Sequence, residues 1–282
     1  MHRRMFALVS LLCCGVSAAA EEPAPRSSGT LNSPYADRYA ASKDLSEFIL
    51  QRAALPAEGS YFYAYLARWE CNDDAGIARR VATAALSDPD VRRVEATKSE
   101  LERCRNVTVS MTTIAMQRSD VEDGRRAGDR LFAPFRGDRG HWYSAFDDAE
   151  LQKAFAFFAQ SGDPGMVWVM AQQLAGVGYR MLIDGKRLSQ DEGRALYTAF
   201  MLGACDRGID CGPSHRWRRT LCIQDGLCDD GLETAWRRGS RDEKDQHEHW
   251  ERVGRYRTLI GESVRRGDWS RFALTADPSP PS

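Results

Sequence analysis

The segment LQKAFAFFAQSGDPGMVWVMAQQLAGV, residues 151–177, decides the fold class of this 282-residue chain. In its first half the apolar side chains recur at the spacing of one helical face: Leu151, Ala154, Phe155, Phe158 and Ala159. The residues Gly162-Asp163-Pro164 end this series, because glycine and proline favour turns. A second helical series follows at Met166, Val169, Met170, Leu174 and Val177. Two helices joined by so short a turn predict an antiparallel helix pair.

Helical patterns also fill the N-terminal half. The apolar residues there fall on two further helical faces: Leu45, Phe48 and Ile49, then Tyr61, Tyr65, Leu66 and Trp69. Asp88-Pro89-Asp90 predicts a helix start, with Asp88 as the cap and proline in the first turn, and this helix should run to about Cys104. Residues 106–116 lean toward strand, but no partner strand of similar quality exists, so helix is favoured there too. The fold class is therefore predicted as all-α.

One sequence spacing suggests a repeat. The dipeptide Gly128-Asp129 recurs as Gly162-Asp163, and this interval matches the period of roughly 34 residues of a helix-turn-helix repeat whose pairs stack on one another. A nonrepeating helical bundle accounts for the same two dipeptides. Both architectures, stacked antiparallel helix pairs and an irregular helical bundle, therefore stay open.

Part of the chain resembles a known family. Residues 174–185, with Gly178-Tyr179 and Asp184-Gly185, followed by Asp191, Ala195, Tyr197, Gly203-Ala204-Cys205 and Gly208, resemble a degenerate Sel1-type repeat, a relative of the tetratricopeptide repeat. Residues 203–228 are similar to uncharacterised exported proteins of Gram-negative bacteria. The resemblance covers about residues 147–228 and implies an α-solenoid-like scaffold. That family is not an enzyme family and implies no catalytic residues.

Residues 1–20 have the pattern of a secretory signal peptide. His2, Arg3 and Arg4 form a positive n-region, residues 5–16 form an apolar h-region, and Ala18-Ala19-Ala20 form a small-residue cleavage site before Glu21. The h-region is shorter than the ~20 apolar residues that span a bilayer, and no later segment reaches 18 uninterrupted apolar residues. We expect a mature chain without a transmembrane segment, located in the periplasm or secreted.

A lipoprotein signal is the weaker alternative. Cys13 or Cys14 would then be acylated, but Leu11 and Leu12 stand where bacterial lipoprotein signals carry small residues. The predicted organisation is a signal peptide over 1–20, a disordered linker over 21–34, a helical-repeat domain over 35–274 and a disordered tail over 275–282.

Composition excludes several classes of protein. The chain is 43% hydrophobic and 28% charged, which is typical of a globular domain and excludes a membrane bundle or a wholly disordered chain. Its net charge is −1, so a nucleic acid is not expected as a partner. The basic run Arg216-Trp217-Arg218-Arg219 is interpreted as a solvated helix face with Trp217 packed inward.

Six cysteines follow the predicted cleavage site, and an even number in an exported chain predicts disulfides. Cys71 and Cys104 each end a helical series, which predicts a Cys71–Cys104 bridge. Cys205 and Cys211 flank Gly208, and Cys222 and Cys228 flank Gly226. A glycine with positive φ can turn the chain back over the last helical turn, so Cys205–Cys211 and Cys222–Cys228 are predicted.

Two alternatives to these pairs are disfavoured. A zinc site is disfavoured because ligand pairs in four-cysteine sites are usually separated by two to four residues, whereas here five residues intervene. A crossed Cys205–Cys222 pair would place the two residues ~12 Å apart along neighbouring helices, beyond the reach of a disulfide.

The sequence carries no recognisable catalytic motif, phosphate loop or His-Glu-x-x-His zinc helix. His141, Trp142 and Tyr143 form an aromatic loop and are the candidate partner-binding residues. His247 and His249 are a candidate metal pair, but on a helix their imidazoles diverge, so a charged helix with Trp250 on its buried side is favoured. No metal or cofactor is expected.

Two function classes follow. The favoured one is a non-enzymatic exported scaffold that binds an unknown protein or peptide partner on its stacked helices. The alternative is a periplasmic enzyme whose acid and base come from Asp147, Asp148 and Glu150 near His141.

Overall fold

The computed structural model describes residues 33–72, 86–132, 147–212, 215–228, 231–239 and 243–275. The described α-helices are α1 (Tyr35–Ala41), α2 (Ser46–Leu50), α3 (Ser60–Glu70), α5 (Val91–Arg103), α6 (Ile114–Arg126), α7 (Asp148–Gln160), α8 (Pro164–Gly176), α9 (Gln190–Asp206), α10 (Arg216–Asp225), α11 (Leu232–Gly239) and α12 (Glu243–Arg266). Short 3₁₀ helices are η1 (Pro56–Glu58), η3 (Val109–Met111), η4 (Arg130–Phe132) and η5 (Gly178–Arg180), and the strands are β1 (Met181–Ile183), β2 (Lys186–Arg187) and β3 (Phe272–Leu274). The predicted all-α fold class is confirmed.

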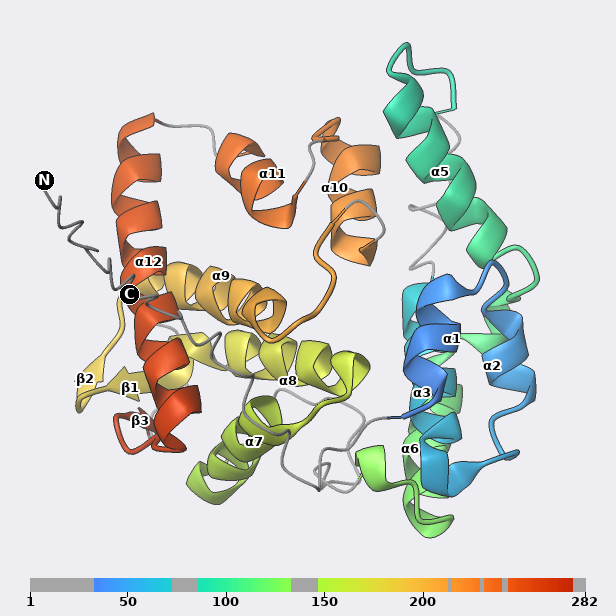
Figure 1. Cartoon of the computed structure of the whole chain (residues 1–282), viewed down its shortest axis with the longest axis horizontal. Helices are drawn as coiled ribbons and strands as arrows, with labels where there is room; N and C mark the ends of the chain where they lie inside the picture. Colours follow the sequence, from blue (N-terminus) through green and yellow to red (C-terminus); the bar gives the residue numbers. More distant parts are fainter. Residues whose placement is uncertain are drawn as a thin grey trace, which may run out of the picture.

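The helices form two packed groups (Figure 1). In the first, α3 packs against α1, α2 and α6. In the second, α8 packs against α7 and α9, and α9 packs against α12. The helix α10 belongs to the second half of the chain but packs along α5, whose C-cap Cys104 is bonded to Cys71 at the end of α3, so α5 and α10 link the two groups.

The helix α8 is the centre of the second group. Asp163 is its N-cap and accepts a hydrogen bond from the Met166 N–H at 2.9 Å, and Pro164 occupies the first turn, where its missing N–H costs nothing. The predicted helix start at Gly162-Asp163-Pro164 is confirmed. Residues 166–175 are all buried, so α8 is covered on every side rather than on one stripe.

The structure contains a small antiparallel sheet that the sequence pattern did not predict. Its order is β2-β1-β3, with Leu182 opposite both Arg187 and Ala273. Asp184 and Gly185 connect β1 to β2 with φ values of 53° and 74°, which is the left-handed backbone that an Asp-Gly hairpin turn requires. Before β3, the ring of Trp269 stacks on Phe155 at 4.3 Å and ties the chain end to α7.

Several element boundaries differ from the predictions. The cap of α5 is Asp90 rather than Asp88, and its side chain accepts from the Arg92 N–H. Residues 106–113 contain only η3 instead of a helix, because Thr113 caps α6 and the helix begins after it. Ser33, predicted within a disordered linker, is buried, and its N–H donates to Asp163 at 3.2 Å. Residues 1–32 and 276–282 lie outside the described residues.

The three disulfides join the cysteines in the predicted pairs: Cys71–Cys104, Cys205–Cys211 and Cys222–Cys228. Cys71 and Cys104 are the C-caps of α3 and α5. Gly208 and Gly226 have φ of 89° and 69°, as the expected reversal over the last helical turn demands.

Among the described helices, none is long and apolar enough to cross a membrane.

Candidate functional site

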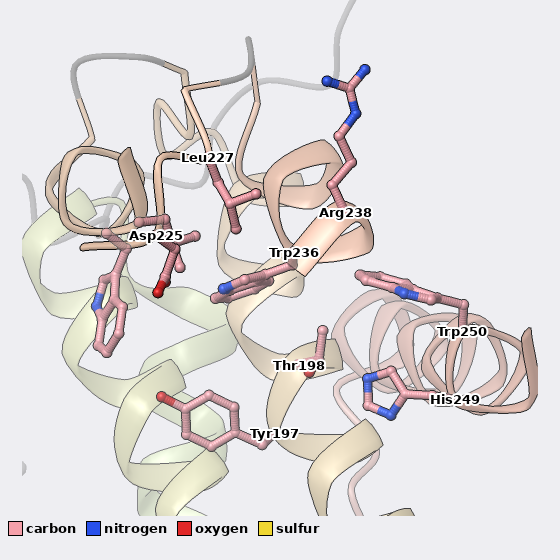
Figure 2. Close-up of a pocket in the computed structure, with 10 residues that line it drawn as sticks. Tyr197, Thr198, Asp225, Leu227, Trp236, Arg238, His249 and Trp250 are labelled. Atoms are coloured by element: carbon pink, nitrogen blue, oxygen red, sulfur yellow. The ribbon is translucent and has the colours of Figure 1, made fainter. Parts of the chain in front are cut away.

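The strongest candidate site is a cavity of about 720 Å³ between α9, α10, α11 and α12 (Figure 2). We call it the aromatic cavity, after the side chains that line it: Tyr197, Thr198, Trp217, Leu221, Asp225, Leu227, Trp236, Arg238, His249 and Trp250. Its volume falls in the range of ligand-binding pockets. Its lining combines apolar rings with a few polar groups, which is the composition that such pockets usually have.

The helix α10 supplies one wall of the aromatic cavity. Trp217, Leu221 and Asp225 follow each other at four-residue steps, so they lie on one face of the helix. The next turn contributes Leu227, whose N–H donates to the Leu221 carbonyl at 3.3 Å. The Cys222–Cys228 disulfide closes this turn, so it fixes Leu227 at the edge of the wall.

The opposite wall comes from α11 and α12. The Arg237 guanidinium lies 4.1 Å from the centre of the Trp250 ring, and Glu233 binds the same guanidinium at 2.9 Å. Burial lowers the pKa of His249, and the neighbouring Arg252 lowers it further, so its imidazole is neutral at pH 7. This wall therefore presents an aromatic surface rather than a charged one.

Several polar groups of the aromatic cavity have no internal partner. The indole N–H groups of Trp217 and Trp250 are buried without an acceptor in the described part of the chain. Asp225 is exposed and makes no hydrogen bond or ion pair with the described residues. Buried polar groups in folded proteins are nearly always hydrogen-bonded, so unpartnered ones need an explanation.

A buried carboxylate anchors α10 from its other side. Glu70 Oε1 accepts from Arg103 Nε at 3.0 Å and from Arg219 Nη2 at 3.2 Å, and Oε2 accepts from the Tyr39 hydroxyl at 2.9 Å. Burial alone would raise the pKa of Glu70, but the guanidinium groups of Arg103, Arg216 and Arg219 hold it below its usual value. The carboxylate therefore stays charged and links α3, α5 and α10.

The basic run at the start of α10 is not the solvated face that the sequence suggested. Arg218 and Arg219 are buried, and Arg219 Nε also donates to Glu100 at 3.0 Å. Arg216 stacks on the Trp69 ring at 4.4 Å. Trp217 is partly buried and lines the aromatic cavity. Glu70 of α3 and Glu100 of α5 pair with Arg219, and Arg218 donates to the Leu227 carbonyl at 2.7 Å, so both cations are held inside the fold.

A second cavity of about 530 Å³ lies between α5 and α10 and is lined in part by Arg103, Arg218 and Arg219. Glu70 pairs with Arg103 and Arg219 in its wall, so the charges of this cavity hold the two helix groups together.

The residues proposed from the sequence for partner binding or catalysis lie away from the aromatic cavity or outside the described residues. His141, Trp142 and Tyr143 lie outside the described residues. Asp147 caps α7 by accepting from the Glu150 N–H at 2.8 Å, and Asp148 accepts from the Leu274 N–H at 2.9 Å. Of the three acids proposed for an enzyme, Asp147 and Asp148 therefore have structural partners, and Glu150 lies in the first turn of α7.

The two histidines of α12 diverge as predicted. His247 is 80% exposed and meets Glu251 at 3.3 Å, whereas His249 turns into the aromatic cavity beside the buried Trp250. Within the described ranges, no group of three metal-binding side chains lies close enough to hold an ion.

The residues of the aromatic cavity were missed as a site by the sequence analysis. The one available signal was the grouping of Trp217, Trp236 and Trp250 in the last third of a chain that has seven tryptophans. No protein-family model, curated protein or solved structure matches this chain. The aromatic cavity is therefore the feature from which a function is inferred.

Proposed function

We propose that this protein is an exported, non-enzymatic helical scaffold of the bacterial envelope that binds a protein or peptide partner through the aromatic cavity. The observation that carries the proposal is the set of aromatic rings, Tyr197, Trp217, Trp236 and Trp250, around one open volume. Tryptophan and tyrosine dominate the energetics of protein recognition, because they bury much area and lose little side-chain entropy.

The polar groups of the aromatic cavity suit a peptide. A peptide offers carbonyl acceptors to indole N–H groups, and Trp217 and Trp250 hold such donors without an acceptor. Neither indole N–H has an acceptor among the described residues, and the Trp250 ring is held under the Arg237 guanidinium at 4.1 Å. Asp225 and Arg238 are exposed at the rim, so the cavity is open to an extended chain.

Location in the envelope rests on two features. Residues 1–20 have the pattern of a cleaved signal peptide, with cleavage after Ala20. The three disulfides are of the kind that persists in oxidising compartments such as the periplasm. The Sel1-like resemblance of residues 147–228 agrees with a scaffold role, since helical repeats present extended binding surfaces.

Selection from a displayed random-peptide library tests the proposal. The purified exported protein is compared with Trp236→Leu, which removes an aromatic wall, and with Thr198→Phe, which fills the aromatic cavity. Tyr179→Leu is the matched control, because Tyr179 is 39% exposed and lies outside the cavity.

Peptides enriched on the unmodified protein should bind the control equally well and both cavity variants at least about ten-fold more weakly. Equal binding to all four proteins, or no enrichment, would overturn the proposal. Turnover of a small molecule by the purified protein would favour the alternative, a periplasmic enzyme with an unrecognised carboxylate and histidine site.

A further inference from the structure

We infer that the aromatic cavity selects a cationic side chain of its partner, a lysine or arginine held between Asp225 and the aromatic rings. This inference rests on the proposed function and adds the chemistry of the partner. Two observations support it: an unpartnered carboxylate that faces the cavity, and aromatic faces that can stack on a cation.

The carboxylate of Asp225 is placed to receive a ligand. Figure 2 shows Asp225 and Trp236 on one side of the aromatic cavity and Tyr197 on the other, with the carboxylate directed into the space between them. Asp225 makes no hydrogen bond or ion pair with the described residues. An exposed carboxylate without a neighbour attracts an external cation.

The carboxylate of Asp225 stays available at the end of its helix. Asp225 is the last residue of α10, and the carbonyl groups just before it already have partners: Arg93 Nε donates to the Ile223 carbonyl at 2.7 Å, and the Leu227 N–H donates to the Leu221 carbonyl at 3.3 Å. The Arg93 guanidinium therefore offsets the negative end of the helix dipole, and it pairs with Asp88 rather than with Asp225. The negative charge that a bound cation would meet in the cavity is that of the Asp225 carboxylate.

The aromatic rings supply the second half of the recognition. A cation over the face of an aromatic ring is attracted by the ring quadrupole, most strongly for tryptophan. Among the described residues, two arginines already make this contact with tryptophan: Arg237 at 4.1 Å from the Trp250 ring centre and Arg216 at 4.4 Å from that of Trp69. Trp236 and Trp217 line the cavity near Asp225 and provide the remaining indole surface.

The other charged groups at the cavity leave the Asp225 charge in place. The side chain of Arg238 extends away from the cavity in Figure 2. His249 is neutral at pH 7, because burial and Arg252 lower its pKa. A cationic side chain therefore complements the cavity, whereas an acidic one would meet a like charge at Asp225.

A set of capped pentapeptides tests the inference. Each has alanine at four positions and lysine, norleucine or glutamate at the centre, and binding to the purified exported protein is followed by tryptophan emission. Norleucine keeps the aliphatic chain of lysine and removes the ammonium group. Free choline is a separate probe, because it carries a cation without a peptide. The variants are Asp225→Asn and, as matched control, Glu122→Gln on the exposed side of α6.

The lysine peptide should bind at least about ten-fold more tightly than the norleucine and glutamate peptides, and Asp225→Asn should remove most of that difference while Glu122→Gln leaves it unchanged. Equal affinity for lysine and norleucine peptides, or an unchanged preference in Asp225→Asn, would overturn the inference and leave the proposed function standing. Tighter binding of choline than of the lysine peptide would also overturn it, because the site would then serve a free ammonium compound. Absence of saturable lysine-peptide binding at millimolar concentrations would likewise overturn the inference. The selection from the peptide library tests the proposed function independently of this experiment.

Discussion

Glu70 and Arg219 are 149 positions apart in the chain, yet Arg219 Nη2 donates to Glu70 Oε1 at 3.2 Å in the buried space between α3 and α10. This contact fixes the helix that carries Trp217 and Asp225, because Arg219 lies on the opposite side of α10 from the aromatic cavity. The stability of the fold and the shape of the candidate site therefore depend on the same ion pair.

Glu70→Gln should destabilise the protein strongly. The substitution leaves Arg103 and Arg219 without their shared carboxylate, and removing one partner of a buried ion pair costs about 3–5 kcal/mol. Chemical denaturation would measure the loss in the free energy of unfolding. The exposed Glu122→Gln should change it by less than ~0.5 kcal/mol, and an equally small effect of Glu70→Gln would contradict the anchoring role.

The disulfides should differ in their contribution to stability. The Cys71–Cys104 bridge spans 33 positions, whereas Cys205–Cys211 spans six, so loop-closure entropy predicts about 4 and about 2 kcal/mol respectively. Replacing each pair by alanine and measuring unfolding in denaturant checks this order. A larger loss for the Cys205–Cys211 pair would show that loop entropy is not the governing effect. Nonreducing peptide mapping should recover the pairs Cys71–Cys104, Cys205–Cys211 and Cys222–Cys228 and no Cys205–Cys222 peptide.

Asp129 should make stability depend on pH. It is buried, and its two carboxylate oxygens accept from the Phe62 and Leu131 N–H groups, both at 3.0 Å. Burial raises the pKa of Asp129 from 3.8 to about 6, and the nearby Asp163 adds to the rise. The folded state therefore binds the proton more tightly than the unfolded state, so this contribution to stability is present below pH 4 and is lost as pH rises through 6.

Asp129→Asn isolates that effect, because asparagine does not titrate. The free energy of unfolding of the unmodified protein, relative to the variant, should fall by up to ~3 kcal/mol between pH 4 and pH 7. Thermal unfolding of both proteins across this range gives the difference. A difference that is constant or rises with pH would be the opposite result.

Asp225→Asn should leave the stability of the free protein nearly unchanged while it weakens the binding of cations. The Asp225 side chain is exposed, and Arg93 already partners the last carbonyl groups of α10, so the free energy of unfolding should change by less than ~0.5 kcal/mol. The melting temperatures of the two proteins, measured without ligand, check this prediction. A loss of stability would indicate that Asp225 has a structural role.

Local features of the fold were predictable from sequence. The start of α8 follows from Asp163-Pro164, and two disulfides follow from Gly208 and Gly226, because each depends on residues within a few positions of one another. The Asp184-Gly185 hairpin carried a local signal as well, but three-residue strands are too short to show an alternating pattern.

Long-range features were not predictable. The burial of Arg219 depends on Glu70 and Glu100, which approach it only in the folded chain. The aromatic cavity needs α9, α10, α11 and α12 at their final positions, and helical periodicity describes one helix at a time. Sequence patterns therefore located the helices and the disulfides but could not locate the site.

Photo-crosslinking in intact cells that export the protein tests the central claim most directly. A benzophenone amino acid is placed at Arg238, exposed at the rim of the aromatic cavity, or at Glu122, on the exposed side of α6. We predict that only the Arg238 position gives an adduct of discrete mass, that its crosslinked peptide contains a lysine or arginine, and that Trp236→Leu abolishes it. Adducts of equal yield at both positions, or an adduct at Arg238 that persists in Trp236→Leu, would contradict the assignment of the aromatic cavity as the binding site.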